Sequence, residues 1–106
     1  MYPKATRVRS ESYRRWVASL PCAICGVEGF SQAAHGNEGK GLALKACDLQ
    51  TFPACAPHWG MPGCHWQIDN SFQMTRDERR QIEADAIAKT QALAREVGRR
   101  ELKEAA

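Results

Sequence analysis

The sequence predicts a small α+β domain that is centred on a structural zinc site and has a helix on each side. Three observations support this fold class. All five cysteines and all three histidines of the 106 residues lie between Cys22 and His65, and thiolates and imidazoles are the side chains that bind zinc. This central segment is rich in Gly and Pro, so its few apolar residues need the added stability of a metal. The flanking segments carry apolar residues at helical spacing.

A single domain, residues 1–106, is expected from the length of the chain. It divides into a basic arm and helix over 1–20, a zinc-binding core over 21–72 and a C-terminal helix over 75–106. No segment has the roughly 20 apolar residues that span a bilayer, and the N-terminus lacks the apolar stretch of a signal peptide. A cytoplasmic protein is therefore expected, in which C-x-x-C cysteines bind metal rather than form disulfides.

Basic residues are concentrated near the N-terminus, although the net charge is only +3. The first 20 residues contain one acidic residue, Glu11, and five basic ones: Lys4, Arg7, Arg9, Arg14 and Arg15. Such a basic arm is typical of proteins that neutralise nucleic-acid phosphates. A solubilising tail has the same pattern, so charge alone does not decide between the two.

The first helix is expected to begin after Ser10, a favourable N-cap residue, and to run to about Leu20. Its apolar residues fall at the spacing i, i+3, i+4 and i+7, which places them on one face: Tyr13, Trp16, Val17 and Leu20. Pro21 then stops the helix.

A zinc knuckle is expected directly after this helix, in the motif C-A-I-C-G. Cys22 and Cys25 are spaced to bind one tetrahedral metal from a tight turn, and Gly26 permits the left-handed backbone that closes such a turn. Residues 27–35 then predict a short strand or hairpin that ends at His35.

Residues 36–41 predict a loop, because three of the six are glycine. They include a lysine but lack the full P-loop pattern, which excludes that type of nucleotide site. The apolar residues 42–44 predict a possible second strand, and residues 49–52 lead into Pro53.

Two helices are expected in the second half of the chain. A short one begins at Cys64, with Trp66 and Ile68 as packing residues. Thr75 and Glu78 form a capping box for a long helix that runs from about Arg76 into the high 90s or beyond. The apolar face expected for the long helix consists of Ile82, Ala86, Leu93 and Val97.

The zinc ligands fall into two half-sites. Cys22 and Cys25 form the first, and Cys55 belongs to the second. Either Cys64 or His58 completes the second half-site, because four-cysteine and three-cysteine, one-histidine zinc sites are both common. The remaining cysteine, Cys47, is expected to be free.

The ordered set CxxCG, AH, GKG, KxxD, PxC and CH resembles the HNH, or ββα-metal finger, endonucleases. It is most similar to a phage-type branch related to the RecA-dependent nucleases. The resemblance covers about residues 21–70, and the segment TRDERR that follows is also similar to that branch. No single motif in the set is specific by itself.

The resemblance implies a role for each matching residue. His35 matches the general base, His65 the ligand of a catalytic divalent metal such as Mg²⁺, and Cys64 a structural zinc ligand, which favours Cys64 over His58. Asp48 stands where the family has an asparagine that braces the loop or orients the base. Ala34 replaces a common metal ligand, so His58, Asp48, Asp69 or water would complete the metal shell.

The function expected from this resemblance is metal-dependent hydrolysis of DNA phosphodiester bonds in a bacterial or phage-infected cell. Lys40 and Lys45 are candidate contacts to the scissile phosphate, and the N-terminal arginines would add sequence-independent affinity. A recombinase or another DNA-processing protein is an implied partner. The alternatives are a non-catalytic zinc module that binds nucleic acid or protein, and a structural zinc domain in a phage assembly.

Overall fold

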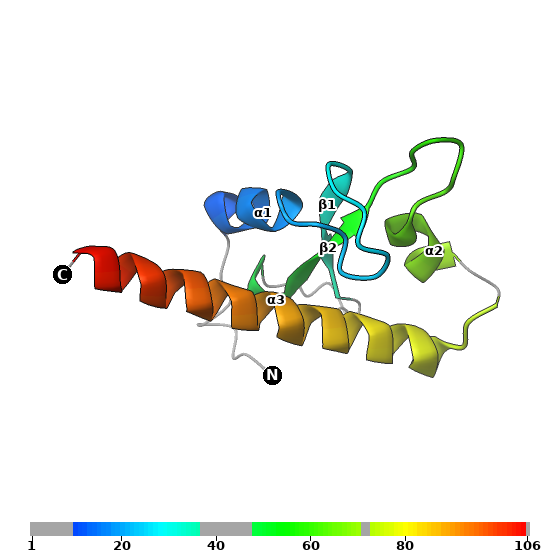
Figure 1. The fold of residues 1–106 in the computed structure, drawn as a ribbon. Coiled ribbons are helices and arrows are strands. Elements are labelled where there is room, and N and C mark those ends of the chain that lie inside the picture. Colours follow the sequence, from blue (N-terminus) through cyan, green and yellow to red (C-terminus); the bar gives the residue numbers. More distant parts are fainter. Residues whose placement is uncertain (1–9, 37–47, 71–72, 106) are drawn as a thin grey trace.

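The computed structural model of the chain describes residues 10–36, 48–70 and 73–105, and side chains as far as residue 98. The elements, in chain order, are α1 (Glu11–Ala18), β1 (Ser31–His35), the 3-10 turn η2 (Asp48–Gln50), β2 (Thr51–Cys55), α2 (Cys64–Asn70) and α3 (Arg76–Ala105). The two strands form a small sheet between α1 on one side and α3 on the other (Figure 1). The expected α+β class, with an N-terminal helix and a long C-terminal helix, is confirmed.

Helix α1 begins as the sequence predicts. The side-chain oxygen of Ser10 accepts a hydrogen bond from the Tyr13 N–H at 3.2 Å, which is an N-cap contact. The helix ends at Ala18, two residues before the expected end, where the Ser19 N–H bonds back to the last turn. Val17 is fully buried on the predicted face, and the other three apolar residues of that face are half-buried.

The sheet is an antiparallel pair whose two faces are covered by different helices. In its register, Ser31 lies opposite Cys55 and His35 lies opposite Thr51. Opposite residues share a face, and neighbours along a strand alternate between faces. One face carries the core on the side of α2 and α3, built from Ala34, Phe52, Ala54, Ile68, Ala86 and Ile87. His35, Thr51 and Cys55 therefore project from the other face, which α1 covers.

Strand β2 is not where the sequence predicted a second strand. The predicted segment, residues 42–44, lies outside the described residues, whereas the strand occupies residues 51–55 with Pro53 at its middle. A proline cannot donate to a ladder, but it is tolerated on an edge strand. Both strands of a two-stranded sheet are edges, and the Pro53 carbonyl accepts a hydrogen bond from the Ala23 N–H at 2.9 Å.

Helices α2 and α3 form where expected, but two packing predictions are wrong. Ile68 of α2 is buried, whereas Trp66 is 51% exposed. The Thr75–Glu78 capping box forms, with reciprocal bonds of 3.1 Å, but Leu93 is exposed and Ile87 packs in the core instead. Leu93 lies off the covered face of α3, because at this level of the helix Thr90 is 1% exposed and Ala94 and Val97 line the hollow beside α1.

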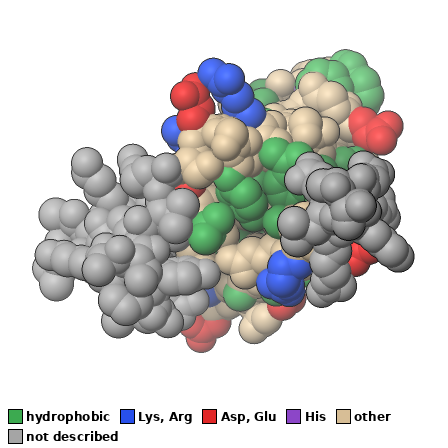
Figure 2. All heavy atoms as spheres, turned by 90° about the vertical axis from the view of Figure 1, so that its left-hand side faces the viewer, with side chains coloured by type: hydrophobic (Ala, Val, Ile, Leu, Met, Phe, Trp, Pro, Cys, Tyr) green, Lys and Arg blue, Asp and Glu red, His purple; other side chains and the backbone are tan. Residues whose placement is uncertain are grey.

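The second half of α3 runs beyond the sheet and lies beside α1. A shallow hollow between the two helices is lined by polar residues and by Tyr13, Trp16, Leu49, Ala94 and Val97. Apolar side chains gather at the centre of the face shown in Figure 2. Among the described residues, no helix is both long enough and apolar enough to cross a membrane.

Candidate metal centre and the His35–Asp48 pair

Four cysteines from three parts of the fold meet at one end of the sheet. Cys22 and Cys25 lie in the turn after α1, Cys55 ends β2 and Cys64 begins α2. Their sulfur atoms all lie within 4.8 Å of one another, and none of the four is in a disulfide. A tetrahedral zinc site with bonds of about 2.3 Å would have sulfur atoms about 3.8 Å apart. The Cys25 and Cys55 sulfurs are 3.7 Å apart, so the group fits a zinc ion.

Backbone N–H groups are directed at two of these sulfurs. The N–H groups of Ile24 and Cys25 donate to the Cys22 sulfur at 3.4 and 3.5 Å, and the Cys64 N–H donates to the Cys55 sulfur at 3.2 Å. Gly26 has φ +83°, the left-handed conformation that the sequence predicts for the end of this turn. These donors stabilise negative sulfur, which is the form that binds metal.

The four thiols do not ionise equally. Burial opposes the thiolate of Cys22, but the hydrogen bonds of the cluster, chiefly those from the N–H groups of Cys25 and Ile24, together outweigh it and lower the pKa of Cys22 to about 7. Burial raises the pKa of Cys55, and burial together with the charge of Cys22 raises the pKa of Cys64. One thiolate thus opposes the ionisation of the next. A divalent cation among the four sulfurs would remove this repulsion and release the remaining protons.

His58 does not belong to this group. Its side chain is buried, and its Nδ1 lies 2.7 Å from the Ala56 carbonyl oxygen. Its ring stacks on Phe30, with the ring centroids 4.4 Å apart. The structure therefore brings Cys64, and not His58, to the other three cysteines.

Substitutions of Cys64 and His58 are expected to differ in their effect on zinc content. Cys64→Ser should reduce the zinc bound from one ion per chain to a small fraction, because a serine hydroxyl does not replace a thiolate ligand. His58→Gln should keep one ion per chain. Metal analysis after gel filtration checks both variants, and loss of zinc from His58→Gln alone would contradict the four-cysteine site.

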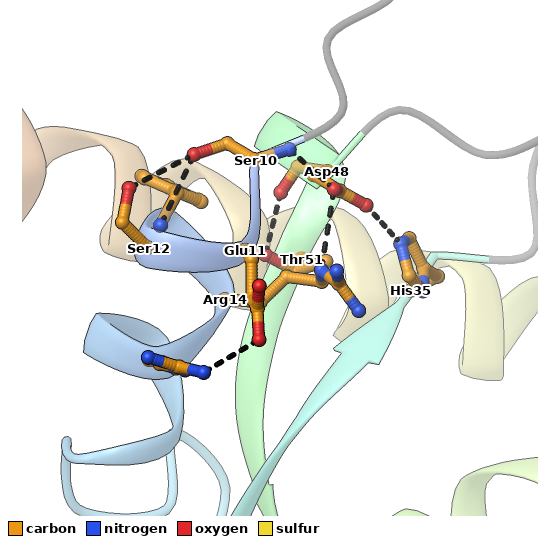
Figure 3. A network of polar contacts seen from close by, with 9 residues as sticks. Ser10, Glu11, Ser12, Arg14, His35, Asp48 and Thr51 are labelled. Carbon is orange, nitrogen blue, oxygen red and sulfur yellow. Dashed lines mark hydrogen bonds and ion pairs between the residues drawn. The ribbon is translucent and has the colours of Figure 1, made fainter.

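A second polar cluster lies at the opposite end of the sheet. Asp48, at the start of η2, is 1% exposed. Its Oδ1 is 2.9 Å from Nε2 of His35, the last residue of β1, and the His35 side chain is 26% exposed. Figure 3 shows the two side chains pointing toward each other from these elements. The pair thus joins a buried carboxylate to an imidazole that solvent can reach.

The other oxygen of Asp48 binds α1. The Ser10 N–H donates to Oδ2 at 2.6 Å, and Nε of Arg14 lies 3.2 Å from the same oxygen (Figure 3). The backbone of Asp48 is also fixed, because its carbonyl accepts from the Thr51 hydroxyl at 2.7 Å. A carboxylate with ionic and backbone donors is held in one orientation.

His65 lies apart from His35. Its Nδ1 is 2.9 Å from Oε1 of Gln32, which precedes His35 by three positions in β1 and therefore projects from the opposite face of the strand. Three residues of a strand cover about 10 Å. The two histidines that the resemblance pairs at one site are thus not brought together, and Gln32, the partner of His65, was not anticipated from the sequence.

The structure describes only two of the six predicted phosphate-binding residues, Arg14 and Arg15. Arg14 binds Asp48, and Arg15 is 78% exposed in an ion pair of 2.6 Å with Glu11. Four of the predicted residues lie outside the described part of the chain: Arg7, Arg9, Lys40 and Lys45. The contacts of Ser10 and Arg14 with Asp48 have no sequence signal, because 38 and 34 positions separate the partners.

The sequence profile of one protein family, described as "Protein of unknown function (DUF968)", matches residues 1–61. The chain belongs to the DUF968 family. The DUF968 match covers the His35–Asp48 pair and three of the four clustered cysteines, and it ends three residues before Cys64.

A curated relative of this DUF968 chain is the uncharacterized protein YdfU of Escherichia coli (strain K12). It is 41% identical over 59 residues, which are 53% of this chain and 16% of that protein. The chain therefore spans about 16% of the length of this relative. No solved structure matches the chain.

Proposed function

We propose that this chain is a zinc-stabilised endonuclease of the ββα-metal (HNH) type, which hydrolyses phosphodiester bonds of DNA with His35 as general base. The observation that supports the proposal most strongly is the contact between His35 and the buried carboxylate of Asp48. A base must be held in one orientation and must keep an accessible lone pair. The local contacts of this pair meet both requirements.

The contacts of Asp48 determine which nitrogen of His35 carries the proton. Arg14 and the Ser10 backbone are donors only, so both require Oδ2 as an acceptor. With Asp48 ionised, Oδ1 is also an acceptor, and His35 donates Nε2–H to it. The lone pair of neutral His35 is then on Nδ1, away from the carboxylate. An aspartate that orients a histidine in this way stabilises the imidazolium formed when the base accepts a proton.

The proposed step uses this lone pair. Nδ1 of His35 takes a proton from water as the water oxygen attacks phosphorus. The bond from phosphorus to the leaving oxygen breaks, its electron pair stays on that oxygen, and solvent water supplies the proton that makes the alcohol. Asp48 stabilises the resulting positive charge through Nε2–H. General-base catalysis of this kind contributes a factor of roughly 10² to 10⁴ in rate.

A divalent ion, which the resemblance implies, would stabilise the charge that develops on the phosphate. His65 keeps Nε2 for such an ion, because Nδ1 faces Gln32. In the described residues, the only group of three or more close His, Cys, Asp or Glu ligand atoms is the cysteine group. The described protein ligands therefore do not form a complete second metal site at His65, and the proposed steps belong to His35 and Asp48 alone.

A non-catalytic zinc module that binds nucleic acid or protein is the second candidate. It is favoured by the separation of His65 from His35, because such a module needs neither histidine for chemistry. The zinc site and the basic residues of α1 are common to both candidates. DNA is the proposed partner in the first, and its dependence on a recombinase rests on the resemblance alone.

Cleavage of supercoiled plasmid DNA separates the two candidates. With Mg²⁺ or Mn²⁺ present, the purified protein should nick the plasmid, and His35→Ala should lower the rate by at least about 10²-fold. His58→Gln is the matched control, because His58 stacks on Phe30 at the end of the sheet opposite the pair. Undiminished cleavage by His35→Ala would exclude His35 as the base, and a wild-type protein with no cleavage of any DNA would favour the zinc module.

A further inference from the structure

Arg14 uses only one edge of its guanidinium group within the protein. Its Nε lies 3.2 Å from Oδ2 of Asp48, and its side chain is 45% exposed. Among the described residues, no hydrogen bond or ion pair engages its two terminal amino groups. The guanidinium group has five N–H donors in one plane, so four of them remain for a ligand. Figure 3 shows Arg14 reaching from α1 toward Asp48, beside the strand that ends in His35.

The neighbouring arginine differs in each of these respects. Arg15 donates through Nη2, one of its terminal amino groups, to Glu11 at 2.6 Å, and its side chain is 78% exposed. Its partner is an exposed carboxylate on the same helix, one turn earlier. Charge alone predicted the same role for both arginines, but only Arg14 is attached to the carboxylate that holds His35.

We propose that Arg14 is the phosphate-binding residue of the His35 site, an inference that rests on the proposed nuclease function. Arg14 keeps its ion pair with Asp48, and its terminal amino groups bind non-bridging oxygens of the phosphate that faces Nδ1 of His35. The planar fork of arginine matches phosphate with two parallel hydrogen bonds. Asp48 thereby sets the position of the base and of the phosphate ligand with a single buried carboxylate.

The burial of Asp48 allows an anion to approach Arg14. The Asp48 side chain is only 2% exposed, and its two oxygens already face hydrogen-bond partners in His35 and the Ser10 backbone and an ion-pair partner in Arg14. An incoming phosphate therefore meets the N–H groups of Arg14 rather than the carboxylate. A lysine would not serve equally well, because an ammonium group lacks the flat edge that binds a carboxylate and a phosphate at the same time.

A titration of the zinc-loaded chain of residues 1–106 with inorganic phosphate tests the role of Arg14 without relying on activity. Nitrogen-correlated NMR follows the Nε–H of Arg14 and the ring of His35. In the wild type, the chemical shifts of both signals should change with phosphate concentration along the same saturation curve. A short DNA duplex should shift the same two signals. If neither phosphate nor duplex shifts them, the inference is wrong.

Three variants make the test specific. Arg14→Gln should abolish the phosphate-dependent shift of His35, and Arg14→Lys should recover at most a small part of it. Arg15→Gln removes the same charge from the same helix, and it should leave this shift in place while weakening DNA binding by less than about fivefold. Zinc content shows whether each variant is folded, and a full His35 shift in Arg14→Gln would overturn the inference.

The outcomes also separate this inference from the proposed function. Cleavage that is lost in His35→Ala but retained at the wild-type rate in Arg14→Gln and Arg14→Lys would support the nuclease and refute the role of Arg14. Phosphate-dependent shifts in a protein that cleaves no DNA would support an anion site at Arg14 and refute the nuclease.

Discussion

Cys55→Ser is expected to abolish zinc binding and the cooperative unfolding of the domain. Cys55 is 1% exposed at the end of β2, and its sulfur touches the Cys25 sulfur and the Cys64 N–H. Structural zinc contributes about 10 to 16 kcal/mol of apparent binding free energy in small zinc domains. The net stability of a domain is only about 5 to 15 kcal/mol, so loss of the ion removes most or all of it.

Zinc analysis and thermal unfolding followed by circular dichroism would measure this effect. The wild type should show one ion per chain and a single transition, and a strong chelator should convert it to the behaviour of Cys55→Ser. Cys47→Ser is the matched control, since Cys47 is the cysteine expected to be free, and it should behave as the wild type does. A zinc-free Cys55→Ser protein with the wild-type melting temperature would show that the ion does not stabilise the fold.

Asp48→Asn is expected to lower the proposed activity strongly while leaving the zinc site intact. The amide has one acceptor oxygen where the carboxylate has two, so it cannot accept from His35 on one side and from Arg14 and Ser10 on the other. If its NH₂ group faces His35, the imidazole must take the opposite tautomer, with its lone pair on Nε2. The equivalent loss in serine proteases lowers kcat by about 10⁴, and a fall of about 10² to 10⁴ is expected here.

Plasmid cleavage rates together with the NMR spectrum of the His35 ring would establish the cause. Asp48→Asn should lower the rate and move the ring proton from Nε2 to Nδ1. Asp85→Asn is a matched control, because Asp85 is an exposed residue of α3 that binds only Gln81 among the described contacts. A normal cleavage rate in Asp48→Asn would contradict an orienting role. A lower rate with an unchanged His35 tautomer would place the defect elsewhere in the cluster.

The elements predicted correctly depend on residues that are close in sequence. The Ser10 cap, the Cys22–Gly26 turn and the Thr75–Glu78 box each involve positions no more than four apart. Hydrogen bonds over so few residues form whenever the local backbone permits, so side-chain chemistry and spacing are sufficient to predict them. The C-x-x-C spacing predicted half of the metal centre for the same reason.

The predictions that failed depend on what lies beside an element. Strand β2 was not predicted; Pro53 at its middle is tolerated because β2 is an edge strand, where a missing N–H costs little. Periodicity placed Leu93 on the buried face of α3, but Thr90, Ala94 and Val97 occupy that face at this level of the helix. Trp66 is similarly exposed because α2 buries Ile68 instead. Burial depends on the extent of the neighbouring element, which a one-dimensional pattern does not contain.

The sequence by itself determined the ligand chemistry of this protein: which cysteines are spaced to bind zinc, and which histidines remain for another task. Tertiary structure decided how these residues are grouped. It brought Cys64 rather than His58 to the metal centre, placed His35 against Asp48, which also pairs with Arg14, and left His65 on the opposite face of the strand. The physical reason is that these groupings depend on contacts between residues 9 to 42 positions apart, whose distances are set by packing around the two-stranded sheet.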